Sequence, residues 1–393
     1  MVLFEDALKT VLSQEFIKAH EIVTLSDSLG RILAGDIFSD MDMPPFDKSA
    51  VDGYAFNISQ DIQNLNPYQI VETIPAGVIP KTALQPGQCS KIMTGAMIPH
   101  GADCVIMVEN TKLVGENMVA FTINTTAKNI CYRGEDIKAG NLVLKKGTLI
   151  TPAHIAVLAS VGVINPKVAM LTKVGIISTG DELVEPSVTP GMAQIRNSNA
   201  YQLEAQVRSV PALPSYYGIA RDEGPELRKM IDHAMESNDV VLLTGGVSMG
   251  DFDFVPEVME QAGIRILFKS IAIQPGKPTV FGRHKNTFIF GLPGNPVSSF
   301  VLVETMVKPF LYRLMGHLHE PLEFMLPLGI DYSRRNSARK SMIPVTIKDG
   351  KVFPVIYHGS AHINAYTVAR ALMIMEIGTN TIKKGDQVYV RPI

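Results

Sequence analysis

Residues 239–254 read D-V-V-L-L-T-G-G-V-S-M-G-D-F-D-F, and this stretch decides the fold class. A short apolar run passes into a glycine-rich turn, and the residues that follow have the spacing of a helix. The pattern predicts a buried strand that ends just before Gly245 and Gly246. In an open parallel sheet, ligands bind outside the carboxyl ends of the strands, so the turn is a candidate binding site.

The glycines of this turn favour an anion as ligand, because they let backbone N–H groups approach it closely. Two other interpretations stay open on this stretch alone. One is an ordinary glycine-rich connection. The other is the nucleophile elbow of a serine hydrolase, since G-V-S-M-G at 246–250 matches G-x-S-x-G with Ser248 as nucleophile. The acids Asp251 and Asp253 fit a phosphate or metal loop better than an elbow.

The surrounding sequence repeats the alternation of strand and helix. Apolar runs at 168–171, 174–178 and 286–291 predict further strands. Helical patterns lie between them at 199–208, 224–235 and 255–263. Strands that alternate with helices of this length predict a central parallel α/β sheet. A long helix is expected over 297–314, bent at Pro309.

The flanking regions have a different sequence pattern from the central region. A helix is predicted over 4–20, a turn and short extended segment over 28–37, and a helix from Pro152 to Gly162. Proline, glycine and short Val/Ile runs predict strands in the remainder. Four domains are expected: a helical domain of 1–40 plus 137–165, an inserted small β domain at 41–136, the central α/β domain at 166–318, and a C-terminal β-barrel-like domain at 319–393.

Composition excludes several classes of function. The chain has 393 residues with 36 Lys and Arg against 38 Asp and Glu, so neither nucleic acid nor an anionic membrane is expected as partner. The longest apolar stretch, 155–164, is too short to span a bilayer. Three scattered cysteines predict no disulfide framework, and the acids in M-V-L-F-E-D oppose a signal peptide. A soluble cytoplasmic protein is expected.

Two further turns carry candidate chemistry. In S-T-G-D-E-L at 178–183, Glu182 follows a predicted strand, and carboxylates that converge there would favour a hard cation such as Mg²⁺. In G-L-P-G-N-P-V-S at 291–298, Pro293 and Pro296 bracket a rigid turn before Ser298. With Lys277, this turn predicts a cradle for a tetrahedral oxyanion such as phosphate, sulfate or molybdate. The alternative is a serine N-cap in a proline turn.

Seven motifs follow one another along the chain: P-P-F-D-K-S-A-V-D-G-Y-A (44–55), I-M-T-G-A-M-I-P-H-G-A-D (92–103), G-E-D-I (134–137), S-T-G-D-E-L (178–183), T-G-G-V-S-M-G-D-F-D (244–253), P-G-K-P (275–278) and G-L-P-G-N-P-V-S (291–298). In this order they resemble the molybdopterin molybdenumtransferase family, whose relatives include the C-terminal domain of gephyrin. The resemblance covers nearly the whole chain.

The resemblance implies an L-shaped homodimer whose central domain is similar to molybdopterin adenylyltransferase. It implies an enzyme that takes adenylylated molybdopterin and molybdate, cleaves the adenylate with Mg²⁺, and releases molybdenum cofactor and AMP. The site is expected between the central domain of one subunit and the inserted β domain of the other. Molybdopterin adenylyltransferase is a candidate partner.

The same resemblance assigns roles to individual positions. Asp52, Asp136, Glu182, Asp222 and Asp253 are the expected catalytic carboxylates, of which Glu182, Asp222 and Asp253 are the expected Mg²⁺ ligands. Together with the turns described above, the expected substrate-binding residues are Thr94, Arg133, Gly245, Gly246, Ser248, Lys277, Pro293, Pro296, Ser298, Arg339 and Ser360. Lys277, Arg133 and Arg339 would balance the charge of molybdate or phosphate, and Ser298 would donate a hydrogen bond to molybdate.

The chain departs from the family pattern at two places. Ser270 and Gln274 stand where many relatives have lysines, and S-A-R-K-S-M-I-P at 337–344 replaces a G-R followed by an aromatic residue. A scaffold role is the alternative from another class, because one branch of the family clusters receptors through its C-terminal domain. The five acidic site residues favour the enzyme, since a scaffold has no use for them.

Overall fold

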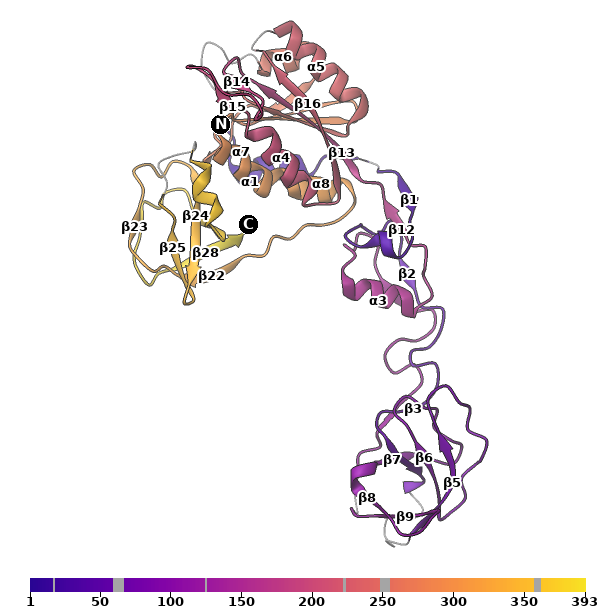
Figure 1. Cartoon of the computed structure of the whole chain (residues 1–393). Helices are drawn as coiled ribbons and strands as arrows, with labels where there is room; N and C mark the ends of the chain where they lie inside the picture. The colour runs from indigo at the N-terminus through magenta and orange to yellow at the C-terminus, as the bar shows by residue number, and fades with distance from the viewer. Residues whose placement is uncertain (17, 59–66, 124–125, 222–223, 248–254, 357–361) are drawn as a thin grey trace. The chain divides into compact units, whose positions relative to one another are not determined.

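The computed structural model describes residues 1–16, 18–58, 67–123, 126–221, 224–247, 255–356 and 362–393 (Figure 1). The chain divides into two compact units. The larger unit comprises 1–35, 146–152 and 165–393, and the smaller unit comprises 36–145 and 153–164. Each unit has its own apolar core.

The larger unit is built on a six-stranded sheet in the order β16-β13-β17-β21-β20-β18. Strands β16 (Ala212–Ala220), β13 (Thr172–Thr179), β17 (Val240–Thr244) and β21 (Thr287–Leu292) are parallel to one another. β20 (Val280–His284) is antiparallel to β21, and β18 (Arg265–Phe268) is antiparallel to β20. The predicted α/β fold is confirmed, and the sheet is mixed because a hairpin joins β20 to β21.

Helices cover both faces of this sheet (Figure 1). On one face lie α1 (Phe4–Leu12), α4 (Asn199–Arg208), α7 (Pro296–Leu302) and α8 (Lys308–Leu314), which share a core with Ile176 and Leu242. On the other lie α5 (Gly224–Ser237) and α6 (Val255–Gln261), which pack with Ile177 and Leu243. Successive strand residues thus point to opposite faces, and both faces are apolar, as a doubly covered sheet requires.

Two predicted helices differ in detail from the structure. The expected helix over 4–20 ends at Leu12, and the chain then forms β1 (His20–Ile22), which pairs with β12 (Lys167–Ala169). In the sequence, Phe16 continues the four-residue spacing of apolar residues that predicts the helix. In the structure its ring lies beyond the helix and packs edge-on against Phe288, with ring centroids 6.0 Å apart. The helix expected over 297–314 contains a π-helical turn at 303–307, directly before the turn that contains Pro309.

The C-terminal residues form a second sheet in the order β19-β24-β26-β28-β22, with β25 paired to β24. Its strands are β22 (Phe324–Pro327), β24 (Lys340–Lys348), β25 (Lys351–Pro354), β26 (Ala371–Met375) and β28 (Gln387–Pro392). A small pair, β23 (Tyr332–Ser333) and β27 (Thr381–Ile382), and the short 3₁₀ helix η5 (Ile363–Thr367) complete this region. The edge strand β19 (Ile273–Gln274) comes from the chain just before P-G-K-P, so this sheet fixes that loop.

The smaller unit contains the six-stranded sheet β7-β4-β6-β5-β9-β8. Its strands are β4 (Gly53–Phe56), β5 (Tyr68–Ile74), β6 (Gln88–Ile92), β7 (Cys104–Met107), β8 (Thr111–Leu113) and β9 (Met118–Phe121). Short pairs join β3 (Lys48–Ser49) to β10 (Ile130–Cys131) and β2 (Ile37–Phe38) to β11 (Leu142–Leu144). Helix α3 (Pro152–Ser160) follows, and the β character expected for this insertion is confirmed.

Among the residues that the structure describes, no helix has the length and apolar character needed to cross a bilayer.

Candidate active site

A cavity of about 650 Å³ lies at the carboxyl ends of the parallel strands of the larger unit. The ends of β13, β17 and β21 and the turns that follow them form much of its lining, as expected for an α/β sheet. Five residues predicted from the sequence line it: Glu182, Gly245, Gly246, Pro293 and Pro296.

The two glycines after β17 have positions that no other residue fits. Gly245 has φ +101°, and a Cβ there would lie 2.3 Å from the carbonyl oxygen of Thr179. Gly246 has φ +61°, and a Cβ there would lie 2.8 Å from a methyl group of Val255. A side chain at Gly245 would collide with the end of β13, and one at Gly246 would collide with Val255 at the start of α6. Either would also strain the backbone. The glycines therefore allow the close approach of this turn to its neighbours, and the binding of an anion by the turn stays a prediction.

Buried polar atoms in the cavity lining lack partners. The Asn199 amide nitrogen donates to the hydroxyl of Thr244 at 2.8 Å and to the carbonyl of Gly294 at 2.7 Å, which ties α4 to the ends of β17 and β21. The Asn199 Oδ1 and the Thr179 Oγ1 make no hydrogen bond with any described residue. Asn199 is 8% exposed and Thr179 is 3% exposed. Both atoms have almost no accessible surface, so a ligand in the cavity does not reach them without movement of the lining.

Glu182 is exposed and lies in the first turn after β13. Its carboxylate lies over Gly180, where a Cβ would be 2.6 Å from Glu182 Oε2. Arg196, from β15 (Ile195–Arg196), also lines the cavity, and its Nε donates to the carbonyl of Val188 at 3.3 Å. The cavity therefore combines a carboxylate, a guanidinium and backbone groups of a glycine turn.

Lys277 and Ser298 are not among the residues that line this cavity. Lys277 is half-buried next to Pro278, which does line it. Ser298 is buried within α7, and its backbone N–H donates to the carbonyl of Asn295 at 3.0 Å. Asn295 is the N-cap of α7, so the alternative of a serine N-cap at 298 is wrong.

The C-terminal sheet contributes to the surroundings of the same cavity. Ile363 of η5 lines it directly. Arg339 donates from Nη1 to the carbonyl of Ile273 at 3.4 Å, which places its guanidinium against the strand that leads into P-G-K-P. Arg339 does not line the cavity itself. The C-terminal region and the α/β sheet are thus connected beside the candidate site.

In the smaller unit the structure brings Asp52 and Thr94 together. Asp52 Oδ1 accepts hydrogen bonds from the backbone N–H of Thr94 at 2.6 Å and from its hydroxyl at 2.8 Å. The backbone N–H first, and the hydroxyl second, lower the pKa of the Asp52 carboxyl below its usual value. Asp52 is therefore an anion over the whole neutral range.

Arg133 has a structural partner in the same unit. Its Nε donates to Asp42 Oδ2 at 2.6 Å, and its backbone N–H donates to Asp47 Oδ1 at 2.7 Å. Asp136 is exposed, and its backbone N–H donates to the carbonyl of Met43 at 3.1 Å. The motifs at 44–55, 92–103 and 134–137 therefore pack together through backbone hydrogen bonds at one end of the small sheet.

Four predicted site residues, Asp222, Ser248, Asp253 and Ser360, lie outside the described residues. The described residues that come next to Asp222 and Asp253 in the sequence lie at the edge of the cavity. Ala220 pairs with Thr179 in the sheet, and the backbone N–H of Val255 donates to the carbonyl of Gly246 at 3.2 Å. The described part of the chain contains no group of three or more His, Cys, Asp or Glu side chains that is suited to hold a metal.

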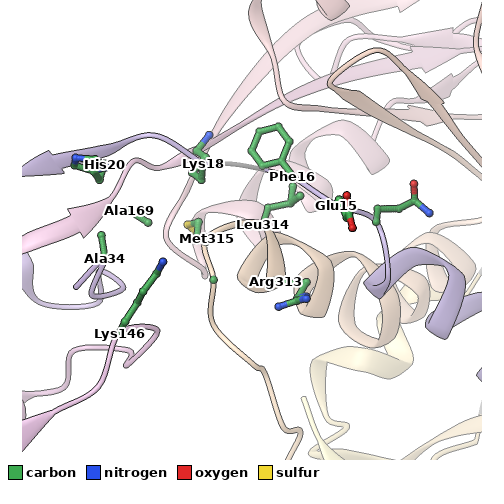
Figure 2. A pocket seen from close by; sticks show the side chains of 12 residues that line it. Glu15, Phe16, Lys18, His20, Ala34, Lys146, Ala169, Arg313, Leu314 and Met315 are labelled. Carbon is green, nitrogen blue, oxygen red and sulfur yellow. The ribbon is translucent and has the colours of Figure 1, made fainter. Parts of the chain in front are cut away.

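A second cavity of about 460 Å³ lies elsewhere in the larger unit, and Figure 2 shows Lys146 on one side of it and Arg313 on the other. Lys18 lines it too, and forms a salt bridge with Asp239. None of the site residues predicted from the sequence lines this cavity. Of these two cavities, only the first is lined by described residues that the sequence predicts for the site.

Sequence reasoning missed several lining residues, above all Thr179, Asn199, Thr244 and Asn295. Each directly ends a strand or begins a helix, which is where ligands of an α/β sheet bind. The run R-N-S-N at 196–199, with two asparagines at the start of a predicted helix, was the available signal. Asn197 of this run also lines the cavity, and its amide fixes the lining by donating to Ser178 Oγ at 3.0 Å and to the Tyr216 hydroxyl at 2.8 Å.

Comparison with known proteins identifies the family. Residues 2–162 match the model described as "MoeA N-terminal region (domain I and II)", and residues 175–313 match "Probable molybdopterin binding domain". The chain is 36% identical over 382 residues to the molybdopterin molybdenumtransferase of Bacillus subtilis, covering 94% of this chain and 89% of the relative. The chain belongs to the molybdopterin molybdenumtransferase family. The predicted family and the prediction of an enzyme of molybdenum cofactor biosynthesis are confirmed.

Other members of the family agree in extent and fold. The molybdopterin molybdenumtransferase of Staphylococcus epidermidis is 34% identical over 400 residues, covering 98% of this chain and 94% of the relative. The crystal structure of the molybdopterin biosynthesis moeA protein from Pyrococcus horikoshii OT3 is 29% identical, covers 100% of both chains and superposes with a TM-score of 0.86. The predicted multidomain architecture is thus confirmed as a MoeA-type fold.

Proposed function

We propose that this enzyme inserts molybdenum from molybdate into adenylylated molybdopterin, with cleavage of the adenylate and release of molybdenum cofactor and AMP. The observation that carries the proposal is a cavity of about 650 Å³ at the carboxyl ends of β13, β17 and β21, lined by Glu182, the two glycines after β17 and the proline turn at 293–296. Cavities of roughly 300–1,000 Å³ are typical of small-molecule sites.

A homodimer is part of this proposal. The candidate residues form two groups in separate units: Glu182 and the glycine turn in the larger, and Asp52, Thr94 and Asp136 in the smaller. Asp52 and Asp136 are exposed, so both are accessible to a ligand. We propose that the Asp52 loop of one subunit completes the cavity of the other, as the family resemblance implies.

The residues around the cavity fit a Mg²⁺ ion in part. Glu182 lines the cavity, and Ala220 and Val255 lie at its edge, each two residues in sequence from Asp222 and Asp253. Two residues of chain span at most about 7 Å, which supports Glu182, Asp222 and Asp253 as the proposed ligands. A bound Mg²⁺ would neutralise charge on the phosphate groups of the substrate.

The remaining residues bind and orient the substrates. Asn199 holds the strand ends together through its hydrogen bonds to Thr244 and Gly294, and Gly245 and Gly246 let the turn after β17 pack closely against β13. We propose that Lys277 and Arg339 balance oxyanion charge beside the cavity. Because Arg133 pairs with Asp42, its proposed task is to hold the 42–47 loop that lies next to the Asp52 loop.

The setting of the reaction is also proposed from the family resemblance. We place the enzyme in the cytoplasm, with molybdopterin adenylyltransferase as the enzyme that supplies the adenylylated substrate. Ser248 and Ser360, which the resemblance assigns to substrate binding, keep that proposed role.

The test supplies adenylylated molybdopterin, molybdate and Mg²⁺ and measures AMP release. Wild type should release AMP only when molybdate is present. Glu182→Gln and Asp253→Asn should each slow release by roughly 100-fold or more, since each loses a charge at the reacting groups. Glu226→Gln, which removes an exposed carboxylate in the first turn of α5, is the matched control and should keep full activity.

Three outcomes would contradict the proposal. Full activity in both carboxylate variants would show that the reaction does not need the carboxylates of Glu182 and Asp253. No AMP release by folded wild type under any condition would favour the scaffold. Inhibition by a serine-directed phosphonate, abolished in Ser248→Ala, would favour a hydrolase instead.

A further inference from the structure

A compact group of cations lies at the opposite end of the α/β sheet from the candidate cavity. Arg265 begins β18, Arg283 lies near the end of β20, and Lys285 lies in the turn that leads into β21. These three residues line a hollow of about 410 Å³. The other described lining residues are Gln14, Gly263 and Leu267, so the hollow holds three positive charges and no carboxylate from its described lining.

The two arginines lie directly opposite each other on neighbouring strands. Arg265 and Arg283 are register partners of the neighbouring strands β18 and β20, so their side chains leave the same face of the sheet. Like charges directly opposite one another destabilise an antiparallel pair. Within the described chain, neither arginine forms a salt bridge. The fold therefore concentrates positive charge here in a chain whose formal net charge is -2.

The group is also held in position. Arg283 Nε donates to the carbonyl of Lys285 at 2.7 Å, and the Arg283 guanidinium lies over the ring of the buried Phe288, 5.1 Å from its centroid. Lys285 is fixed in a tight turn with φ 49°. Arg265 is exposed at the edge of the hollow. A ligand that binds here meets a guanidinium that is already oriented, which lowers the entropic cost of binding.

We propose that this hollow, which we call the Arg265–Arg283 site, binds the phosphate group of a small phosphorylated molecule. Guanidinium groups match the geometry of phosphate oxygens and bind them with paired hydrogen bonds. Lys285 adds a third positive charge, suited to a doubly or triply charged anion. A hollow of about 410 Å³ holds more than one tetrahedral anion, which favours an organic phosphate over the free ion. This site is separate from the proposed catalytic cavity.

The experiment measures binding of two probes, inorganic phosphate and glycerol 3-phosphate, by calorimetry on the full-length protein. Wild type should bind glycerol 3-phosphate, and Arg265→Gln/Arg283→Gln should bind it at least 10-fold more weakly. The matched control, Lys112→Gln/Lys229→Gln, removes two exposed charges elsewhere and should bind as wild type does. Equal binding of inorganic phosphate to wild type would assign the site to the free anion instead of the organic phosphate.

A thermal measurement separates a ligand site from a structural role. Without phosphate, the melting temperature of the double arginine variant reflects two opposing changes: the like-charge pair is removed, and the contact of Arg283 with Phe288 is lost. With glycerol 3-phosphate, only wild type and the lysine control should gain melting temperature. Equal affinity of wild type and the arginine variant, or an equal gain in melting temperature of both with glycerol 3-phosphate, would overturn the proposal.

Discussion

Gly245 determines how closely the β17 turn approaches β13. A Cβ at this position would lie 2.3 Å from the carbonyl oxygen and 2.7 Å from the hydroxyl oxygen of Thr179, at φ +101°. Gly245→Ala should therefore cost both backbone strain and a shift of the strand end, roughly 1–3 kcal/mol in the free energy of unfolding. It should also weaken substrate binding, because Thr179 lines the same cavity.

The control for this substitution is Gly30→Ala. Gly30 has φ +74°, but a Cβ there meets nothing within 4 Å, so only the backbone strain remains. Urea unfolding should show a smaller loss for Gly30→Ala, with substrate binding intact. Equal losses of stability and binding in both variants would mean that the close approach to Thr179 is unimportant.

Asp52 and Thr94 allow a test by titration. The backbone N–H of Thr94 is the larger cause of the lowered pKa of Asp52, and the hydroxyl is the next. Thr94→Val keeps the first and removes the second, so the pKa of Asp52 should rise part of the way towards its usual value. Carboxyl NMR titration measures this change. The pKa of Asp331, which Lys384 and Lys383 lower, serves as the internal control and should stay unchanged.

The sign of the effect on stability follows from the direction of the shift. A carboxyl whose pKa is lowered by folding contributes stability above its unfolded pKa of about 3.9, and this contribution is lost as pH falls through the folded pKa. Thr94→Val should thus be less stable than wild type at neutral pH, and part of the difference should vanish in acid. A difference independent of pH would show that the hydroxyl acts only through packing.

Lys18 and Asp239 link two elements that are far apart in the sequence. Lys18 follows α1 and Asp239 precedes β17, and their side chains are only 10% and 22% exposed. Asp239 Oδ2 also accepts the backbone N–H of Lys173 at 2.8 Å. Lys18→Met leaves this carboxylate with one remaining donor, so unfolding should become easier by about 1.5–3 kcal/mol.

A double-mutant cycle with Asp239→Asn isolates the pair. The coupling should account for most of the loss in Lys18→Met, as measured by urea unfolding. Lys112→Met, at an exposed lysine of β8, should change stability by no more than about 0.5 kcal/mol. Additive losses in the cycle would show that packing of the Lys18 stem, rather than the ion pair, stabilises this junction.

Most elements of the α/β sheet were predictable because their local pattern and their tertiary role agree. The helix expected over 199–208 has those bounds in α4, and β17 and β21 are continuous apolar runs buried on both faces. The unpredicted strands lack that pattern. β16 contains Pro214, which an edge strand tolerates, and β18 is a short edge strand that begins with Arg265.

The candidate site was predictable where a motif carries its own geometry. Gly245, Pro293 and Pro296 stand in turns whose shape follows from residue type. Asn199 was not predictable, since its importance arises from two hydrogen bonds to Thr244 and Gly294, which lie 45 and 95 residues away. Arg133 shows the reverse: residue type suggested anion binding, and tertiary structure supplies Asp42 as its partner.

The division of the candidate residues between two units makes the proposed homodimer testable. If the Asp52 loop of one subunit completes the cavity of the other, then a chain with Asp52→Asn and a chain with Glu182→Gln damage different halves of each site. Each variant alone has no intact site. A mixed dimer has one site in which both variant residues meet and one in which both residues are native.

Co-expression of the two variants should therefore restore AMP release. Random pairing gives about half mixed dimers, each with one native site, so recovery should approach about a quarter of wild-type activity. The control combines Glu182→Gln with Gly245→Ala, which both alter the larger unit and should give no recovery beyond the activity of the separate variants. If Asp52→Asn and Glu182→Gln also fail to complement in purified mixed dimers, each cavity uses the Asp52 loop of its own chain or none.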